Sequence, residues 1–195
     1  MRCIVLLLLA LAPAWNPLFS QKSIPLKAGI LAEQISLPTF EDYGSRKGFG
    51  ITLGTNFAYK QKEKSALLQT LDIHYYQHKE YGSGIMLSSL FDYSIRPGKL
   101  NIDVKAGPGF MLFSPFTPVY SPVEGGYEKA DQMQGKWAGI VSLSCSYQVG
   151  TIRPYLAYTA MAEIPFITTY SSLLPHQMLE IGVSFSITTK KSSHE

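Results

Sequence analysis

The chain has 195 residues, enough for one domain with a sizeable core and too few to expect two. Charged residues make up only 16% of it, against about 25% in an average soluble domain, whereas 46% are hydrophobic. The formal net charge of +3 gives no reason to expect a nucleic-acid partner.

The first twenty residues predict a secretory signal peptide. Arg2 precedes an apolar run at residues 4–11, and the small residue Ser20 precedes a polar stretch. That run is shorter than the about 20 residues that a helix needs to cross a bilayer. We expect cleavage after Ser20 and a mature domain at 21–195 with a net charge of +2, because Arg2 is lost. A single cysteine, Cys145, then remains, so the mature fold has no internal disulfide.

Eight segments of the mature chain alternate apolar and polar residues with a period of two, the pattern of strands with one apolar face. Phe49, Ile51 and Leu53, for example, share one face of their segment. The predicted strands are residues 24–35, 49–59, 67–78, 85–95, 100–112, 137–147, 152–164 and 179–187. Most have about ten residues, the length of a tilted strand that crosses a bilayer. In the first, Leu31 interrupts the alternation, so a short helix is the alternative there.

The connections between these segments alternate between short and long. The short polar turns are residues 60–65, 96–99 and 148–151, and the intervening connections are 39–48, 79–83, 114–136 and 165–176. Short turns on one side and longer loops on the other are typical of outer-membrane barrels, in which the short turns face the periplasm. No internal repeat or linker divides the chain.

Alternation alone does not distinguish a membrane barrel from a secreted lipocalin-like barrel, because the two bury opposite faces. Here the polar face is mostly Gly, Ala, Ser and Thr, which suit a narrow packed interior better than a solvated surface. Aromatic residues also lie near both ends of the apolar face, as in the two girdles of a lipid-facing surface. The predicted girdles are Phe49, Tyr75, Phe110 and Trp137 on the outer side, and Tyr59, Tyr93, Tyr147 and Phe185 on the periplasmic side.

The last predicted strand carries a short motif at Glu180, Gly182, Phe185 and Ile187. It resembles the β-signal of bacterial outer-membrane proteins, which the membrane-insertion machinery reads on the last strand. Two features depart from that pattern: the final position is Ile187 rather than Phe, and a polar tail, 188–195, follows it. Together with the eight segments, the mature chain is similar to the small barrels of the OmpA-transmembrane and OmpX kind. The resemblance implies an all-β fold, an eight-stranded antiparallel up-and-down transmembrane β-barrel in outer-membrane lipid.

The polar face carries ionisable residues that would fill the barrel. They are Lys27, Glu33, Asp72, His74, Asp92, Asp103, Lys105, Arg153, Glu163 and Glu180. An eight-stranded barrel is just wide enough for side chains to fill, so these groups must pair or trap water. We expect a structural network centred on Arg153 and Lys105. Loss of Arg153 would leave buried carboxylates without a partner and destabilise the barrel. The functional alternative is an ion path or a pocket open at one end.

Histidines raise two further hypotheses. His74 and His78 share a strand face but lie about 13 Å apart, too far for one metal ion, so we expect no metal or cofactor. A lipid A-modifying enzyme would need a serine beside an oriented histidine. The candidate pairs are Ser171 or Ser172 with His176, and Ser83 with His78. Neither matches the His-x-Ser motif of lipid A deacylases, so we expect no catalytic site.

The loop at 114–136 is the expected contact surface for an extracellular ligand or polysaccharide, because long loops on rigid scaffolds commonly carry binding. Its candidate residues are Tyr120, Glu124, Tyr127 and Glu128. We therefore expect a non-enzymatic envelope structural or surface-interaction protein. A lipid A-modifying barrel and a secreted lipocalin-like barrel are the alternatives, and a channel would need a continuous water-filled lumen, which eight strands disfavour.

Overall fold

The computed structural model describes residues 23–35, 48–78, 82–118, 120–123, 125–129, 133–164 and 174–188. The expected signal peptide and the tail beyond Thr188 lie outside the described residues. The described strands are β1 (Ser23–Ile35), β2 (Gly48–Gln61), β3 (Ser65–His78), β4 (Gly82–Ile95), β5 (Leu100–Pro115), β6 (Tyr120–Val123), β7 (Gly126–Lys129), β8 (Gln134–Tyr147), β9 (Ile152–Ile164) and β10 (Leu174–Thr188). None of the described residues belongs to a helix long and apolar enough to cross a membrane.

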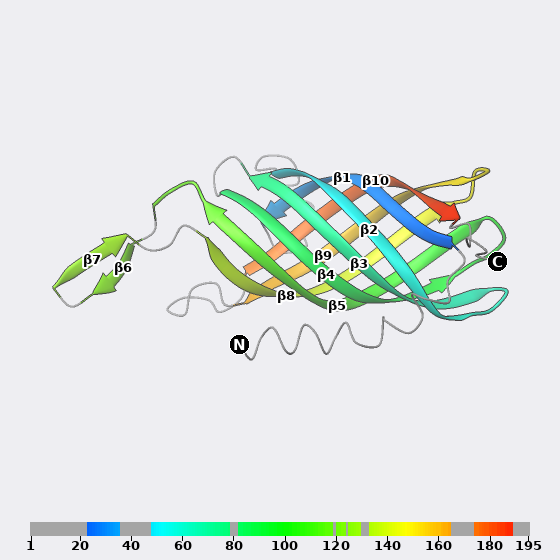
Figure 1. Cartoon of the computed structure of the whole chain (residues 1–195), viewed down its shortest axis with the longest axis horizontal. Coiled ribbons are helices and arrows are strands. Elements are labelled where there is room, and N and C mark those ends of the chain that lie inside the picture. Colours follow the sequence, from blue (N-terminus) through cyan, green and yellow to red (C-terminus); the bar gives the residue numbers. More distant parts are fainter. Residues whose placement is uncertain are drawn as a thin grey trace, which may run out of the picture.

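Eight of these strands close into one barrel (Figure 1), in the order β1-β10-β9-β8-β5-β4-β3-β2. Every neighbouring pair is antiparallel, and β1 closes the sheet by pairing with both β2 and β10. Gly29, for example, lies opposite Thr52 on one side and Gly182 on the other. The predicted eight-stranded antiparallel barrel is confirmed. The first segment is a strand from Ser23 to Ile35 and not a helix, although Leu31 points inward there.

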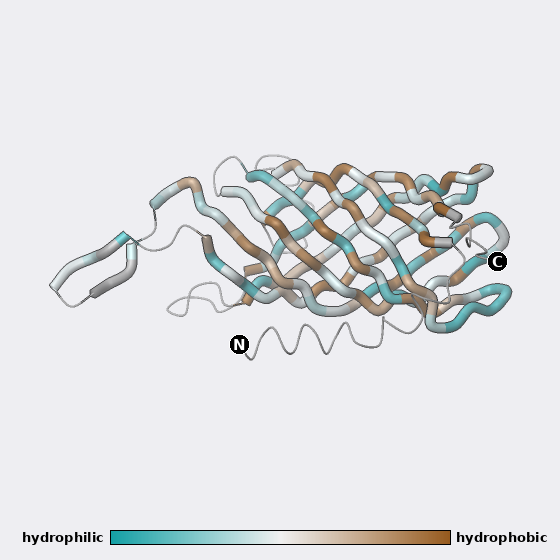
Figure 2. Tube along the Cα trace, in the orientation of Figure 1, coloured by the Kyte–Doolittle hydropathy of each residue, from teal (hydrophilic) through white to brown (hydrophobic). Residues whose placement is uncertain are grey.

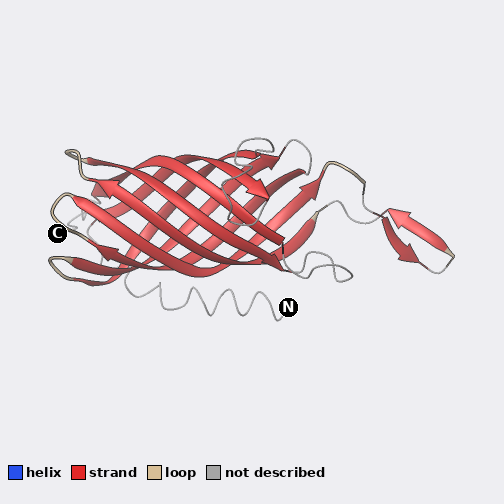
Figure 3. Ribbon diagram, turned by 180° about the vertical axis from the view of Figure 1, so that it is seen from behind, coloured by secondary structure: helices blue, strands red, loops and turns tan. Residues whose placement is uncertain are grey.

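Three tight turns join strands at one end of the barrel, called the short-turn end below (Figure 3). They lie at 62–64, 96–99 and 148–151, close to the predicted positions. Gly98 and Gly150 have φ values of +68° and +58°, which glycine adopts without the steric cost that a Cβ imposes. The opposite end, the loop end, receives the other connections, of which 79–81 has three residues and is no longer than the tight turns. The barrel strands have 13 to 16 residues, and all of them except β9, which has the predicted bounds, are longer than the alternation indicated.

The connection between β5 and β8, predicted to be a loop, contains a short β-hairpin. β6 and β7 form a separate two-stranded antiparallel sheet, with Tyr120 opposite Lys129 and Pro122 opposite Tyr127. This hairpin extends away from the loop end of the barrel (Figure 1). Each of its strands has only four residues, too few for a period of two to be recognised.

The outer wall of the barrel is apolar. Exposed hydrophobic side chains, among them Leu53, Ile73 and Val141, alternate along the strands with inward residues, and hydrophobic positions recur over the whole wall (Figure 2). Phe49 and Tyr75 are exposed near the loop end, and Tyr93, Tyr147 and Phe185 near the short-turn end. A secreted lipocalin-like barrel holds its apolar face inside and shows a polar face to water. Here the apolar face is outside, so the lipocalin-like alternative is wrong. Hydrocarbon is the environment that suits such a surface.

Candidate functional site

The inward residues of the loop-end half include a buried ionic cluster, defined here as Glu33, Lys136, Glu163 and His176. His176 Nδ1 lies 2.7 Å from Glu33 Oε1, and its Nε2 lies 3.2 Å from Glu163 Oε2. The Lys136 ammonium contacts the other oxygen, Glu163 Oε1. Both ring nitrogens of a histidine donate only when the ring is doubly protonated. Two cations then face two carboxylates, and the cluster balances its own charge.

This cluster corrects one part of the enzyme hypothesis. His176 was expected in the last outer loop beside Ser171 or Ser172, but it lies inside the barrel on β10, between two carboxylates. Its two serine partners lie outside the described residues. For the other pair, His78 is buried on the inward face, whereas Ser83 is the register partner of Gln77 and faces the opposite side of the wall. The Ser83–His78 arrangement therefore does not form.

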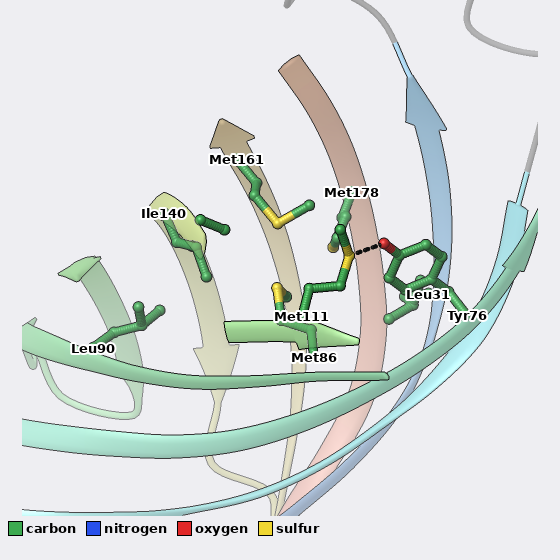
Figure 4. Close-up of a cluster of buried hydrophobic side chains, with 9 residues drawn as sticks. Leu31, Tyr76, Met86, Leu90, Met111, Ile140, Met161 and Met178 are labelled. Atoms are coloured by element: carbon green, nitrogen blue, oxygen red, sulfur yellow. Dashed lines mark hydrogen bonds between the residues drawn. The ribbon is translucent and has the colours of Figure 1, made fainter. Parts of the chain in front are cut away.

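Next toward the short-turn end lies an apolar layer, called the methionine layer below. Figure 4 shows Met86, Met111, Met161 and Met178 gathered between the strands, and Met111 accepts a hydrogen bond from the Tyr76 hydroxyl. The other members of the same buried cluster are Leu31, Tyr76, Leu90, Ala138 and Ile140. Methionine is unbranched and fills irregular space well. This layer separates the polar groups of the two halves.

On the short-turn side of the methionine layer, Lys27 is the central cation. Its ammonium lies 3.3 Å from Asp72 Oδ1 and 3.4 Å from Glu180 Oε1. Tyr155 donates a hydrogen bond to Glu180 and places its ring 5.4 Å from the Lys27 ammonium. Side chains from β3, β9 and β10, two of them carboxylates, thus contact this one lysine. Lys27 lies four residues before Leu31 along β1, which sets its depth below the methionine layer.

His74 lies near this group, but its contacts are with hydroxyl groups. Its Nδ1 lies 3.0 Å from Thr52 Oγ1, and its Nε2 lies 3.3 Å from Ser88 Oγ. The described residues contain no group of three or more His, Cys, Asp or Glu side chains placed to hold a metal ion.

Arg153 does not occupy the central position that was expected of it. It lies near the short-turn end of β9, and its Nε and Nη2 donate to Gln148 Oε1 at 2.9 and 2.7 Å. Asp103 accepts from Ser144 at 3.0 Å. The network is instead centred on Lys27 and Lys136. Lys136 was missed because it falls in a segment predicted to be loop, whereas β8 begins at Gln134.

The structure places all ten predicted network residues on the inward side of the wall. It brings Lys27, Asp72 and Glu180 together, and it joins Glu33 to Glu163 through His176. Lys105 and Asp92 are register partners on β5 and β4, yet no ion pair joins Lys105 to a carboxylate in the described part of the chain. A cavity lies beside them, toward the short turns.

Three of the four candidate binding residues, Tyr120, Tyr127 and Glu128, lie on the projecting hairpin. Tyr127 is 76% exposed and Tyr120 is 58% exposed. Glu124 lies outside the described residues, and Glu128 is paired with Ser121 across the hairpin. Phe116 and Met133, where the chain leaves and re-enters the barrel, are also exposed. The hairpin therefore presents aromatic side chains on an element that the barrel wall does not cover.

The residues of the predicted assembly motif divide between the two faces of β10. Glu180 is buried inside, and Gly182 lies so close to β1 that a Cβ there would come within 2.3 Å of the Ala28 carbonyl oxygen. Phe185 and Ile187 point outward. Cys145 is a free cysteine and is also on the exposed outer wall.

No protein-family model and no curated protein matches this chain. Among solved structures, it is similar to the attachment invasion locus protein Ail of Yersinia pestis, with 10% identity and a TM-score of 0.52 over 86% of this chain and 99% of that one. The likeness to Neisserial surface protein A has 14% identity and a TM-score of 0.53 over 85% and 96% of the two chains. Ail in complex with the heparin analogue sucrose octasulfate gives 9% identity and a TM-score of 0.50, over 85% and 97%. At these identities the likeness concerns the fold. The chain is an eight-stranded antiparallel barrel with the architecture of small bacterial outer-membrane proteins.

Proposed function

We propose that this protein is a non-enzymatic integral outer-membrane barrel that binds an extracellular protein through the β6–β7 hairpin. The observation that carries the proposal is the exposure of Tyr120 and Tyr127 on an element outside the barrel wall. Tyrosine is enriched among the residues that dominate protein interfaces, since it combines apolar area with a polar end. The loop end would face the cell exterior and the short turns the periplasm.

The hairpin also suggests the kind of partner. Among the described residues, each strand of the two-stranded sheet has one edge without a strand neighbour, and such an edge can pair with an extended segment of another chain. Residues 116–133 contain Glu124, Glu128 and Asp131 against the single base Lys129. This acidic balance would repel a sulfated polysaccharide of the kind represented by the heparin analogue in the Ail complex. A protein with neutral or basic surface groups fits better.

Two observations support a role without catalysis. His176, the histidine expected in the last outer loop, is held between Glu33 and Glu163 inside the barrel. His78 and Ser83 face opposite sides of the wall. Export would depend on residues 1–20 as signal peptide, and insertion on recognition of the β10 motif by the assembly machinery.

The location is tested by extracting outer-membrane fractions and comparing the gel mobility of boiled and unboiled protein. A compact unboiled band that resists sodium dodecyl sulfate is expected in that fraction. Recovery of the protein in the periplasm or medium without detergent would contradict the membrane assignment.

The binding role is tested by displaying wild-type protein and the double variant Tyr120→Ala/Tyr127→Ala on cells, then measuring adhesion to immobilised extracellular proteins and polysaccharides. We expect adhesion to a protein ligand to weaken by about tenfold or more, because two central aromatic contacts are removed. Lys129→Ala, on the same hairpin, serves as the matched control and should retain adhesion. Unchanged adhesion of the tyrosine variant, or adhesion only to polysaccharides, would contradict the proposed partner.

A further inference from the structure

The interior of the short-turn half is hollow. It contains an open cavity of about 220 Å³ whose wall includes Arg96, Gln148 and Thr151, residues of the short turns. The cavity therefore reaches the short-turn rim of the barrel. An engineered protein cavity of about 150 Å³ is known to bind benzene, so a small organic molecule fits this space.

The cavity wall carries more positive than negative charge. Its cations are Lys27, Arg96, Lys105 and Arg153, and its acids are Asp92 and Asp103. Lys27 is already held by Asp72 and Glu180, which lie outside the cavity lining. The hydroxyl groups of Ser146 and Ser184 also line the wall, whereas the hydroxyl groups of Ser144 and Tyr155 already donate to Asp103 and Glu180.

Lys105 is the least satisfied of these cations. It is only 9% exposed, and no carboxylate lies within 4.0 Å of its ammonium in the ranges that the structure describes. Its register partner Asp92 is 3% exposed, and Asp92 Oδ1 has no hydrogen-bond partner in those ranges. Buried charges are normally paired and hydrogen-bonded, because leaving water without a partner is costly. Because Lys105 lines the cavity, an acceptor bound there can pair with its ammonium.

The two arginines at the rim also keep donors available. Arg153 uses its Nε and Nη2 for Gln148 and its Nη1 for the Asn101 side-chain amide at 3.0 Å, which leaves two of its N–H donors, and Arg96 uses its Nε for Ser94 Oγ at 3.4 Å. A guanidinium group has five N–H donors in a plane that matches the oxygens of a carboxylate or a phosphate. Both side chains line the cavity near its opening.

We propose that this cavity is a binding site for a small oxyanion, a carboxylate or a phosphate, with Lys105 at its floor and Arg96 and Arg153 at its mouth. The site lies at the end opposite the hairpin, so it is separate from the proposed adhesion role. Entry from the periplasm depends on the proposed orientation, whereas binding itself does not. An anion supplies the acceptor that Lys105 lacks and offsets the excess positive charge of the wall.

The test is a titration of the purified, membrane-extracted protein in lipid nanodiscs with succinate and, separately, with inorganic phosphate at constant ionic strength. Amide resonances of Asp92, Ser94, Asp103 and Ser144 are followed by NMR. Saturable shifts are expected for at least one probe, with Kd raised at least about tenfold in Lys105→Met, because a charge-assisted hydrogen bond is lost. Both faces of the barrel are accessible in a nanodisc, so the outcome does not depend on the orientation or on hairpin binding.

Lys129→Met removes the same charge from the exposed hairpin and should bind the probe as the wild type does. Unboiled gel mobility checks that each variant is folded, and Arg153→Gln replaces Lys105→Met if that variant fails to fold. The proposal is overturned if neither probe gives saturable shifts, if chloride at equal ionic strength gives the same shifts, or if the folded cavity variant binds as tightly as the wild type.

Discussion

The two halves of the barrel interior are built from the same eight strands, yet one is filled and the other is hollow. In the loop-end half, the cluster of Glu33, Lys136, Glu163 and His176 matches two carboxylates with two cations in direct contact. In the short-turn half, Lys105 and Asp92 face each other without an ion pair beside a cavity of about 220 Å³. Strand number alone therefore does not decide whether this barrel is filled.

The difference lies in which side chains occupy the inward positions. Toward the loop end, methionines and Tyr76 fill the lumen, and the ionic cluster packs directly beyond them. Toward the short turns, the inward positions of β8 are Ser142, Ser144 and Ser146, which are too small to reach the barrel axis. Large inward side chains close one half, and the small inward residues of β8 leave space in the other.

The largest effect is expected from breaking the filled half at Glu163. Glu163→Ala removes a carboxylate that contacts both Lys136 and His176, and it leaves a buried positive charge without that partner. Breaking a buried ion pair from one side typically costs about 3–5 kcal/mol. The free energy of unfolding in urea, measured on protein folded into lipid, should fall by about that amount.

The paired variant Glu163→Ala/His176→Leu removes one acid and one cation together and should recover part of the lost stability. A single variant as stable as the wild type would show that the cluster does not hold the loop-end half together.

A smaller effect is expected from opening the methionine layer. Met111 is fully buried, and its sulfur accepts the hydrogen bond of Tyr76. Met111→Ala should lower the free energy of unfolding by about 2–5 kcal/mol because it leaves a cavity. Met111→Leu conserves the volume and should cost less than about 1.5 kcal/mol. Equal losses in the two variants would indicate that the sulfur contact, and not the filling of space, stabilises this layer.

The sequence was sufficient to predict the strands and their faces because alternation is local. Ile51 and Thr52 fall on opposite faces wherever β2 pairs, so no neighbour had to be known. The ends of strands were harder. β8 begins at Gln134 and β10 at Leu174, where the apolar band has ended, so Lys136 and His176 were assigned to loops.

Partner choice inside the barrel could not be predicted, because it depends on register across strands. Lys27 forms ion pairs with Asp72 and Glu180 because β1 closes the barrel between β2 and β10 in one particular register. The same limit applies to the methionine layer. Met86 and Met111 occur singly among small residues on polar faces, and only the closed barrel brings them together.

The smallest effect is expected at Arg153, the residue first expected to anchor the network. Its Nε and Nη2 donate to Gln148, five residues earlier, and its Nη1 to the Asn101 side-chain amide, all at the rim of the hollow half. Arg153→Ala should therefore change the free energy of unfolding by less than about 1 kcal/mol, as is usual for partly exposed charged groups. Gln148→Ala removes the Nε and Nη2 contacts from the other side and is the matched control. A loss of several kcal/mol in Arg153→Ala alone would mean that Arg153 balances the buried acids of the hollow half. In that case the two halves would both depend on paired charge, and the contrast between them would be one of packing only.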